Sequence, residues 1–268
     1  KIMRERTPYL SLLTLPVLLL LVIGCGRPAE HEEAVDREFS ELLQPVPAHA
    51  VMAQEGYYVW GASVVQYEGL YHMYYSRWPL DSGFSAWVTD SEIAHAVADN
   101  ATGPYRFVGV TLPARGAEYW DGVCTHNPNV HRFGGRFYLY YMGNTGDGRA
   151  TRSLNFVHRN NQRVGVAWAD DPAGPWTRMD HPVIDVSEDT TAYDALMTSN
   201  PSATRTKDGR FLLIYKAVAK HEPLPFGGPV THLVAIADHP AGPFVKRGEP
   251  VFYKEGLQFP AEDPYIWW

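Results

Sequence analysis

Cysteine is nearly absent from this 268-residue chain, which carries Cys25 and Cys124 alone. Two cysteines exclude the disulfide framework of small secreted domains and the cysteine-rich sets that hold structural zinc. Positive charge is also scarce: the net charge is −7, and no basic stripe marks a nucleic-acid-binding surface, so nucleic acid is excluded as a partner. The sequence also lacks a glycine-rich phosphate loop and a serine nucleophile elbow.

Long hydrophobic runs are absent except near the beginning of the chain. Arg4 and Arg6 precede an apolar run at residues 10–23, which Ser11, Thr14 and Pro16 interrupt. Cationic, apolar and small-residue parts in this order indicate a signal peptide over residues 1–24. A transmembrane anchor is the alternative, but the run is shorter than the roughly 20 apolar residues that a bilayer requires. We therefore expect export.

The apolar run ends in Val22-Ile23-Gly24-Cys25, which resembles a bacterial lipobox. The resemblance implies that Cys25 receives a lipid and becomes the mature N-terminus. Several acyl chains on one residue give durable attachment to a membrane. We expect an anchored lipoprotein in the periplasm or at the cell surface, with a disulfide between Cys25 and Cys124 as the structural alternative.

Residues 25–50 are acidic and contain proline, without a sustained apolar period, so they are predicted to form a tether. A short amphipathic helix at residues 35–43 is the alternative for part of this segment. From residue 51 to residue 268 the chain is rich in Tyr, Trp, Phe, Val, Gly and Pro. That composition favours strands and tight turns, and predicts one all-β domain.

The domain contains an internal repeat. A turn glycine opens an alternating aromatic strand at Gly69, Gly135 and Gly209, and a Gly-Pro turn follows each strand at residues 103–104, 174–175 and 242–243. These turns recur after 71 and then 68 residues. A third motif precedes each aromatic strand, as Trp60-Gly61-Ala62, His126-Asn127-Pro128 and Ser199-Asn200-Pro201, and returns as Glu262-Asp263-Pro264.

Such a repeat predicts a β-propeller, in which small sheets pack radially and cover one another. A β-sandwich is the competing fold, but it does not predict a repeated unit of this length. The fourth unit stops after its first strand, and a propeller must close to remove its edges. We therefore expect a C-terminally truncated domain of about three blades and the start of a fourth, with Met3 as the true start.

These motifs resemble the five-bladed propeller glycosidases of glycoside hydrolase family 43, within a subgroup without a secure substrate. The resemblance covers residues 57–268 and implies three carboxylates at the axial ends of successive first strands. This chain departs from that pattern, because the matching positions hold Gly61 or Ala62, Asn127, and Ser199 or Asn200. An amide cannot exchange a proton near neutral pH. Some relatives also carry a calcium ion in the central channel, so the resemblance allows a structural calcium here. The sequence does not identify ligands for calcium or another metal, and it predicts no cofactor.

Other residues are candidates for the catalytic groups. Glycoside hydrolysis uses two carboxyl groups about 5 to 10 Å apart. Asp121 and Asp194 each lie six residues before the Asn-Pro motif, so both could reach the mouth of the central funnel. Capping of the incoming turn is the structural alternative for both. Glu262 is the third candidate, with Asp263 assigned a structural role, and His126 is a candidate proton donor or a structural histidine.

Further side chains are predicted to bind substrate. Indole rings suit the C–H faces of sugars, although most tryptophans in propellers pack between blades. Arg77 is expected either to bind an anionic sugar from the funnel or to pair with Glu92 inside the blade. The predicted substrate-binding set is Trp60, Arg77, Trp78, Trp87, Glu92, Trp120, Asn127, Asn200 and Lys216.

The sequence thus predicts a glycoside hydrolase that acts outside the cytoplasm on an oligo- or polysaccharide, with a uronate-containing or sulfated substrate as the form that suits Arg77 and Lys216. The rival hypothesis is a non-catalytic carbohydrate-binding lipoprotein. The small residues and amides at the expected carboxylate positions favour that rival.

Overall fold

A computed structural model describes residues 38–149, 151, 153–254 and 256–267. The chain divides into two compact units, residues 1–45 and 46–268. In the first unit the described part contains one short helix, α1 (Phe39–Leu42). The predicted signal peptide and the predicted lipid-attachment residue, Cys25, lie outside the described residues. Within the described ranges, no helix is long and apolar enough to cross a membrane.

The second unit contains three four-stranded antiparallel sheets, each formed by four consecutive strands. They coincide with the repeat units, and we call them blades 1, 2 and 3. Blade 1 consists of β1 (Tyr57–Tyr67), β2 (Leu70–Pro79), β3 (Glu92–Ala98) and β4 (Arg106–Leu112). Blade 2 consists of β5 (Cys124–Phe133), β6 (Arg136–Asn144), β7 (Arg163–Ala169) and β8 (Thr177–Arg178). Blade 3 consists of β9 (Met197–Arg205), β10 (Phe211–Val218), β11 (Val230–Ala237) and β12 (Val245–Lys246).

Helical segments lie before the first strand and in the connections between strands. They are three 3₁₀ turns, Ala48–Ala50, Leu80–Ser82 and Phe84–Val88, and the helix α2 (Phe156–Asn160) in the described part of this unit. The hairpins between first and second strands use glycines with positive φ: Gly69 (+83°), Gly135 (+90°) and Gly209 (+88°). A residue with a Cβ atom rarely adopts this conformation, which explains why glycine marks each repeat.

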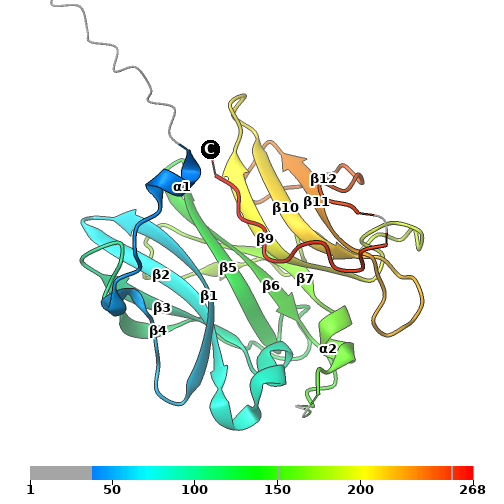
Figure 1. Ribbon diagram of the computed structural model, residues 1–268, viewed down its shortest axis with the longest axis horizontal. Coiled ribbons are helices and arrows are strands. Elements are labelled where there is room, and N and C mark those ends of the chain that lie inside the picture. Colours follow the sequence, from blue (N-terminus) through cyan, green and yellow to red (C-terminus); the bar gives the residue numbers. More distant parts are fainter. Residues whose placement is uncertain (1–37, 150, 152, 255, 268) are drawn as a thin grey trace, which may run out of the picture. The chain divides into compact units, whose positions relative to one another are not determined.

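The first strands of successive units are joined by a repeated hydrogen bond. Ser63 Oγ accepts from the backbone N–H of Val130 at 2.9 Å, and Asn129 Oδ1 accepts from that of Ala203 at 2.8 Å. Ser202 Oγ then accepts from Ile266 at 3.0 Å. The first strands therefore follow one another in order, with β5 between β1 and β9 and the C-terminal segment beside β9 (Figure 1).

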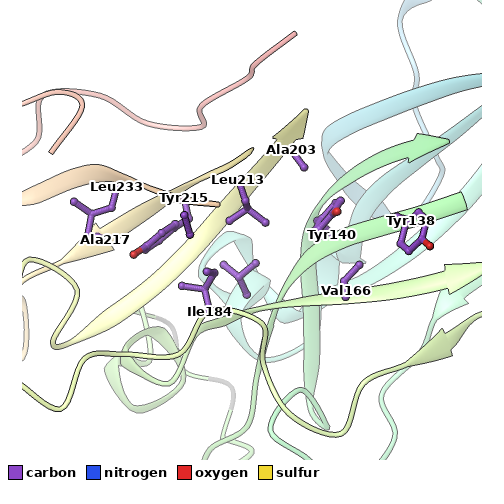
Figure 2. Close-up of a cluster of buried hydrophobic side chains, with 11 residues drawn as sticks. Tyr138, Tyr140, Val166, Ile184, Ala203, Leu213, Tyr215, Ala217 and Leu233 are labelled. Atoms are coloured by element: carbon purple, nitrogen blue, oxygen red, sulfur yellow. The ribbon is translucent and has the colours of Figure 1, made fainter. Parts of the chain in front are cut away.

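Apolar and aromatic side chains fill the space between neighbouring blades. Between blades 2 and 3 the cluster includes Tyr140 and Val166 from one sheet and Leu213, Tyr215 and Leu233 from the other (Figure 2). Buried tyrosine hydroxyls are hydrogen-bonded across the blades, since Tyr140 donates to Pro240 O at 2.6 Å. Tyr74 donates to Pro172 O in the same way one blade earlier.

The prediction of an all-β domain built from repeated four-stranded sheets is therefore confirmed. The number of blades in the whole propeller stays a prediction. For the site, the important consequence is that the first strands β1, β5 and β9 lie side by side with the C-terminal segment, which carries the fourth copy of the motif but does not form the strand predicted there.

Candidate functional site

A cavity of about 250 Å³ lies where these first strands begin. Its walls come from all three blades and from the C-terminal segment. Most of its lining was predicted from the sequence; Phe84 was not predicted, and Asp263 was expected to be structural. The lining residues are Trp60, Trp78, Phe84, Trp87, His126, Asn127, Asn200, Lys216, Glu262 and Asp263. A second cavity of about 120 Å³ runs along the first strands and shares Asn127, Asn200 and Asp263.

One backbone feature recurs at the same position of β1, β5, β9 and the C-terminal segment. Gly61, Asn127, Asn200 and Asp263 all have left-handed backbone, with φ values of +47°, +47°, +44° and +45°. Glycine adopts this conformation freely, and Asn and Asp are the side chains that tolerate it best. The strand pairing shifts register at this position, between Trp60 and Ala62 in blade 1. The four residues are therefore equivalent positions in the four units.

The missing carboxylates, which distinguish this chain from the pattern that it resembles, can therefore be assigned to individual residues. Three of the four left-handed positions have no acidic side chain: glycine in the first unit and asparagine in the next two. Asp263 alone carries a carboxylate there. Its Oδ1 accepts from Asn127 Nδ2 at 3.3 Å and also from Asn200 Nδ2. A Cβ atom on Gly61 would lie 3.2 Å from Asn127 Oδ1, so these positions adjoin one another.

The charged groups of the cavity gather beside Asp263. Lys216 Nζ, from β10, contacts Glu262 Oε1 in an ion pair. Asn200 Nδ2 donates to the same Glu262 oxygen at 2.9 Å and to Asp263. Desolvation by the surrounding protein and then the negative charge of Glu262 raise the pKa of Asp263, whereas Lys216 and the Asn200 amide oppose that rise. Asp263 is thus a carboxyl group with increased affinity for a proton.

His126 lies at the inner wall, between indole rings. Its ring centroid is 5.6 Å from that of Trp78 and 5.2 Å from that of Trp87. Its Nδ1 is 2.7 Å from the Ser91 hydroxyl. Burial, and to a lesser extent the positive charge of Lys216, lowers the pKa of His126 to about 3, so the ring is neutral at physiological pH.

Blade 1 supplies an aromatic wall. Trp60 and Phe84 are 45% and 54% exposed, and their rings meet edge to face at 6.2 Å. Trp78 is buried beneath them and stacks on Tyr58 at 5.3 Å. Phe84 lies in the connection between β2 and β3, on the same short 3₁₀ helix as Trp87. That shared connection was the sequence signal for Phe84, since Trp87 was predicted and Phe84 precedes it by three residues.

The expectation that Asp121 and Asp194 reach the funnel mouth is wrong. Both side chains are buried and neither lines the cavity. Asp121 accepts from the Tyr141 hydroxyl at 2.6 Å and pairs with Arg115 at 2.7 Å. Asp194 accepts from the Tyr215 hydroxyl at 3.1 Å and pairs with Lys246 at 2.6 Å.

Blade 1 shows why the position of Asp121 and Asp194 has a structural role. There the equivalent tyrosine, Tyr75, donates its hydroxyl to Gln54 Oε1 at 2.8 Å. A neutral amide thus does for Tyr75 what the carboxylates do for the other two tyrosines. The common requirement is an acceptor for a buried tyrosine hydroxyl. The role is closest to the structural alternative, although the partners are tyrosines and cations instead of turn amides.

Arg77 and Glu92 are also outside the cavity. Arg77 donates to Glu92 Oε1 from Nε at 2.9 Å and from Nη2 at 2.7 Å, and its guanidinium lies over the rings of Tyr57 and Phe107. The structural alternative, an ion pair within the blade, is therefore the correct one. The two residues face each other in the register of β2 and β3.

Trp120 is a packing residue and does not line the cavity. Its ring stacks on Tyr141 at 5.8 Å, and its Nε1 donates to Met179 O at 3.3 Å. A Cβ atom on Gly143 or Gly165 would clash with this ring at 2.8 and 2.5 Å. The indole thus occupies space that two glycines leave open on adjacent strands.

Over the described ranges, no group of three or more His, Cys, Asp or Glu side chains is placed to hold a metal ion. Cys124 is a buried free thiol whose Sγ donates to Trp87 O at 3.2 Å.

Comparison with known proteins gives relatives at the level of structure. No family model and no curated protein matches the chain. Among solved structures it is similar to Zg3597, a family 117 glycoside hydrolase of the marine bacterium Zobellia galactanivorans, at 24% identity over 72% of this chain and 56% of that one, with a TM-score of 0.57. A complex of BT0996 with RGII matches at 20% identity, over 78% of this chain and 62% of that one, with a TM-score of 0.59. Fructan 1-exohydrolase IIa from Cichorium intybus matches at 14% identity, over 74% of this chain and 33% of that one, with a TM-score of 0.55.

The chain thus spans about 56 to 62% of the length of the first structures that it matches. At these identities the likeness concerns the fold. The three sheets have the propeller-type fold that these glycoside hydrolases share.

Proposed function

We propose that this protein is a glycoside hydrolase whose active site is the 250 Å³ cavity, with Asp263 and Glu262 as its acid–base groups. One observation carries the proposal: an aromatic wall faces a pair of carboxyl groups of unequal surroundings, one beside Lys216 and the other with a raised pKa. Carboxyl groups held in different environments are the usual source of the acid and the base in glycoside hydrolysis. The fold shared with glycoside hydrolases supports the same function.

The roles follow from the contacts. Asp263, whose pKa is raised, is the proton donor to the oxygen of the leaving sugar. Glu262 is the partner carboxylate, which stabilises the positive charge that develops on the sugar ring, because carboxyl groups this close leave no room for a water between them and the sugar. Both carboxyl groups contact Asn200 Nδ2, so the contacting oxygens are at most about 6 Å apart. Lys216 fixes the position of Glu262.

The cavity dimensions favour the end of an oligosaccharide. Its volume of about 250 Å³ is smaller than the roughly 300–1,000 Å³ of sites for drug-sized ligands, so it admits one sugar ring. The exposed rings of Trp60 and Phe84 lie at its rim, where they would contact the next ring along the chain. We therefore infer an exo-acting enzyme.

The charge of the substrate is a separate question. A uronate-containing or sulfated sugar was expected from Arg77 and Lys216. Arg77 is held by Glu92 outside the cavity, and Lys216 already pairs with Glu262. Since Glu262 already neutralises Lys216, and no other Lys or Arg among the described residues lines the cavity, the site favours a neutral sugar ring over an anionic one.

Export and lipid attachment at Cys25 remain proposals from the N-terminal sequence, and they place the substrate outside the cytoplasm. Incorporation of labelled palmitate, and its loss in Cys25→Ser, would test the anchor.

A non-catalytic carbohydrate-binding protein is the second candidate. It is favoured by Gly61, Asn127 and Asn200, which occupy the positions where the family resemblance implies carboxylates. In that case the aromatic wall and the amides of the cavity would bind a sugar without hydrolysing it.

Screening of the full chain against p-nitrophenyl glycosides and against neutral and uronate-containing oligosaccharides separates the two candidates. Hydrolysis that falls at least 100-fold in Asp263→Asn and in Glu262→Gln, with Asp170→Asn unchanged as a surface control, would support the enzyme. Sugar binding by calorimetry without turnover would support the binding protein. Full turnover in both cavity variants would exclude this acid–base assignment.

A further inference from the structure

His126 has two ring nitrogens in different surroundings. Nδ1 is 2.7 Å from the hydroxyl of Ser91, a residue that is 3% exposed. Nε2 has no hydrogen-bond partner among the described residues. It is not among the buried side-chain atoms that lack a partner, so it is not fully enclosed by protein. Since the ring lines the 250 Å³ cavity, Nε2 is the atom that it presents to a bound molecule.

The Ser91 hydroxyl decides which nitrogen carries the hydrogen. In the described part of the chain, Nδ1 of His126 is the one partner of this hydroxyl. A buried hydroxyl that donates to Nδ1 satisfies both groups. If Nδ1 carried the hydrogen instead, the hydroxyl proton of Ser91 would have no acceptor, and a buried donor without an acceptor is unfavourable.

We propose that Ser91 holds His126 as the neutral Nε2–H tautomer, so that His126 donates a hydrogen bond to an oxygen of the bound sugar and does not exchange a proton in hydrolysis. Ser91 is then a positioning residue, and His126 is a specificity residue that selects a ligand with an acceptor oxygen in front of Nε2. The sugar ligand rests on the proposed function; the tautomer does not.

The charges around the ring agree with a neutral donor. Lys216, Glu262 and Asp263 are the charged groups of the cavity, and Trp78, Trp87 and Ser91 pack against the ring from the other elements. Burial and Lys216 both lower the pKa of His126, to about 3. An imidazole that stays neutral from pH 5 to pH 8 cannot serve as the general acid there, whereas its Nε2–H remains a donor at every pH in that range.

The tautomer is tested by NMR on the full chain with ¹⁵N-labelled histidine rings and without sugar, between pH 5 and pH 8. We expect His126 to show a protonated Nε2 and an unprotonated Nδ1 throughout. Ser91→Ala should give a mixture of tautomers, and Ser91→Thr, which keeps the hydroxyl, should restore the single one. A protonated Nδ1 in the unaltered protein, or an imidazolium anywhere in this range, would overturn the proposal.

The role in binding is tested by comparing two variants on the best substrate from the glycoside screen. Gln places an amide N–H near the position of Nε2 and does not titrate, so His126→Gln should stay within about threefold of the unaltered KM and keep its pH profile. His126→Ala should raise KM about tenfold or more with a smaller change in kcat. A 100-fold loss of kcat in both variants would show that His126 transfers a proton. If the chain hydrolyses nothing, the proposed function fails while the NMR result still decides the tautomer.

Discussion

Lys216 forms an ion pair with Glu262 on the wall of the cavity, although 46 residues separate them in the chain. Lys216 belongs to the second strand of blade 3, and Glu262 precedes the left-handed residue of the next unit. In blade 1 the equivalent residue, Ser76, also reaches forward, because its hydroxyl accepts from the backbone N–H of Asn127 at 2.9 Å. One strand position thus contacts the following unit in two different ways.

Replacement of Lys216 by Met should lower kcat about tenfold. Loss of the ammonium removes the charge that holds Glu262 and that lowers the pKa of Asp263. The pKa of Asp263 should therefore rise further, and the alkaline limb of the kcat profile should move to higher pH. Lys220→Met, at an exposed lysine two residues beyond β10, is the matched control. An unchanged pH profile in Lys216→Met would contradict the coupling.

Asp263→Asn should stabilise the folded protein at neutral pH. The pKa of Asp263 is raised on folding from the ordinary value of 3.8, so its contribution to stability is complete below pH 3.8 and is lost as the pH rises through the folded pKa. Asparagine stays neutral, and Asn127 and Asn200 show that it fits the same backbone. The gain in denaturation midpoint should be small because water screens the group, larger at pH 8 than at pH 4. A loss of stability at pH 8 would show that the carboxylate itself holds the site together.

Asp121→Asn should destabilise the protein by about 3 kcal/mol, because it leaves Arg115 and Arg178 beside a neutral group in the interior. Turnover by the folded fraction should be unchanged. Asp180→Asn removes an exposed partner of the same Arg115 and should cost less than about 1 kcal/mol. Thermal unfolding and kcat measured together would check both. A 100-fold drop in kcat at unchanged stability would return Asp121 to the catalytic candidates.

Trp60→Ala and Phe84→Ala should each raise KM for an oligosaccharide several-fold, up to about tenfold, with kcat nearly unchanged. Both rings are exposed at the rim, so stability should change little. A monosaccharide glycoside with a small leaving group should be affected much less, since it does not reach the rim. Tyr253→Ala, at an exposed aromatic residue that does not line the cavity, is the control. Equal effects on both substrates would place these rings against the first sugar.

The repeat made the fold and most of the cavity predictable from sequence. Gly69, Gly135 and Gly209 gave the hairpins, and the motifs around Asn127, Asn200 and Asp263 gave the strand ends that meet at the site. Spacing along the chain cannot say on which side of an incoming segment a side chain leaves. For that reason Asp121 and Asp194 were assigned to the cavity although they face buried tyrosines.

The sequence did contain a signal for the structural role of Asp121 and Asp194. Gln54 lies seven residues before Gly61, close to the six-residue spacing of Asp121 and Asp194, and an amide in that place argues against acid–base chemistry. Asp263 was assigned a structural role because the sequence does not show the direction of its side chain either. The sequence does not show that neighbouring Glu262 and Asp263 both turn toward Asn200, because the left-handed backbone that turns them is visible only in the structure.

The four left-handed residues have a consequence for how such a protein changes over time. Gly, Asn and Asp are all accepted by this backbone at little cost, so a negative charge can be gained or lost at the axis by one substitution while the sheets keep their packing. Under the proposed function, the gain or loss of a carboxyl group at these positions would separate hydrolysis from plain sugar recognition. Asn127→Asp and Asn200→Asp are the shortest routes by which a descendant of this chain would acquire additional acidic groups.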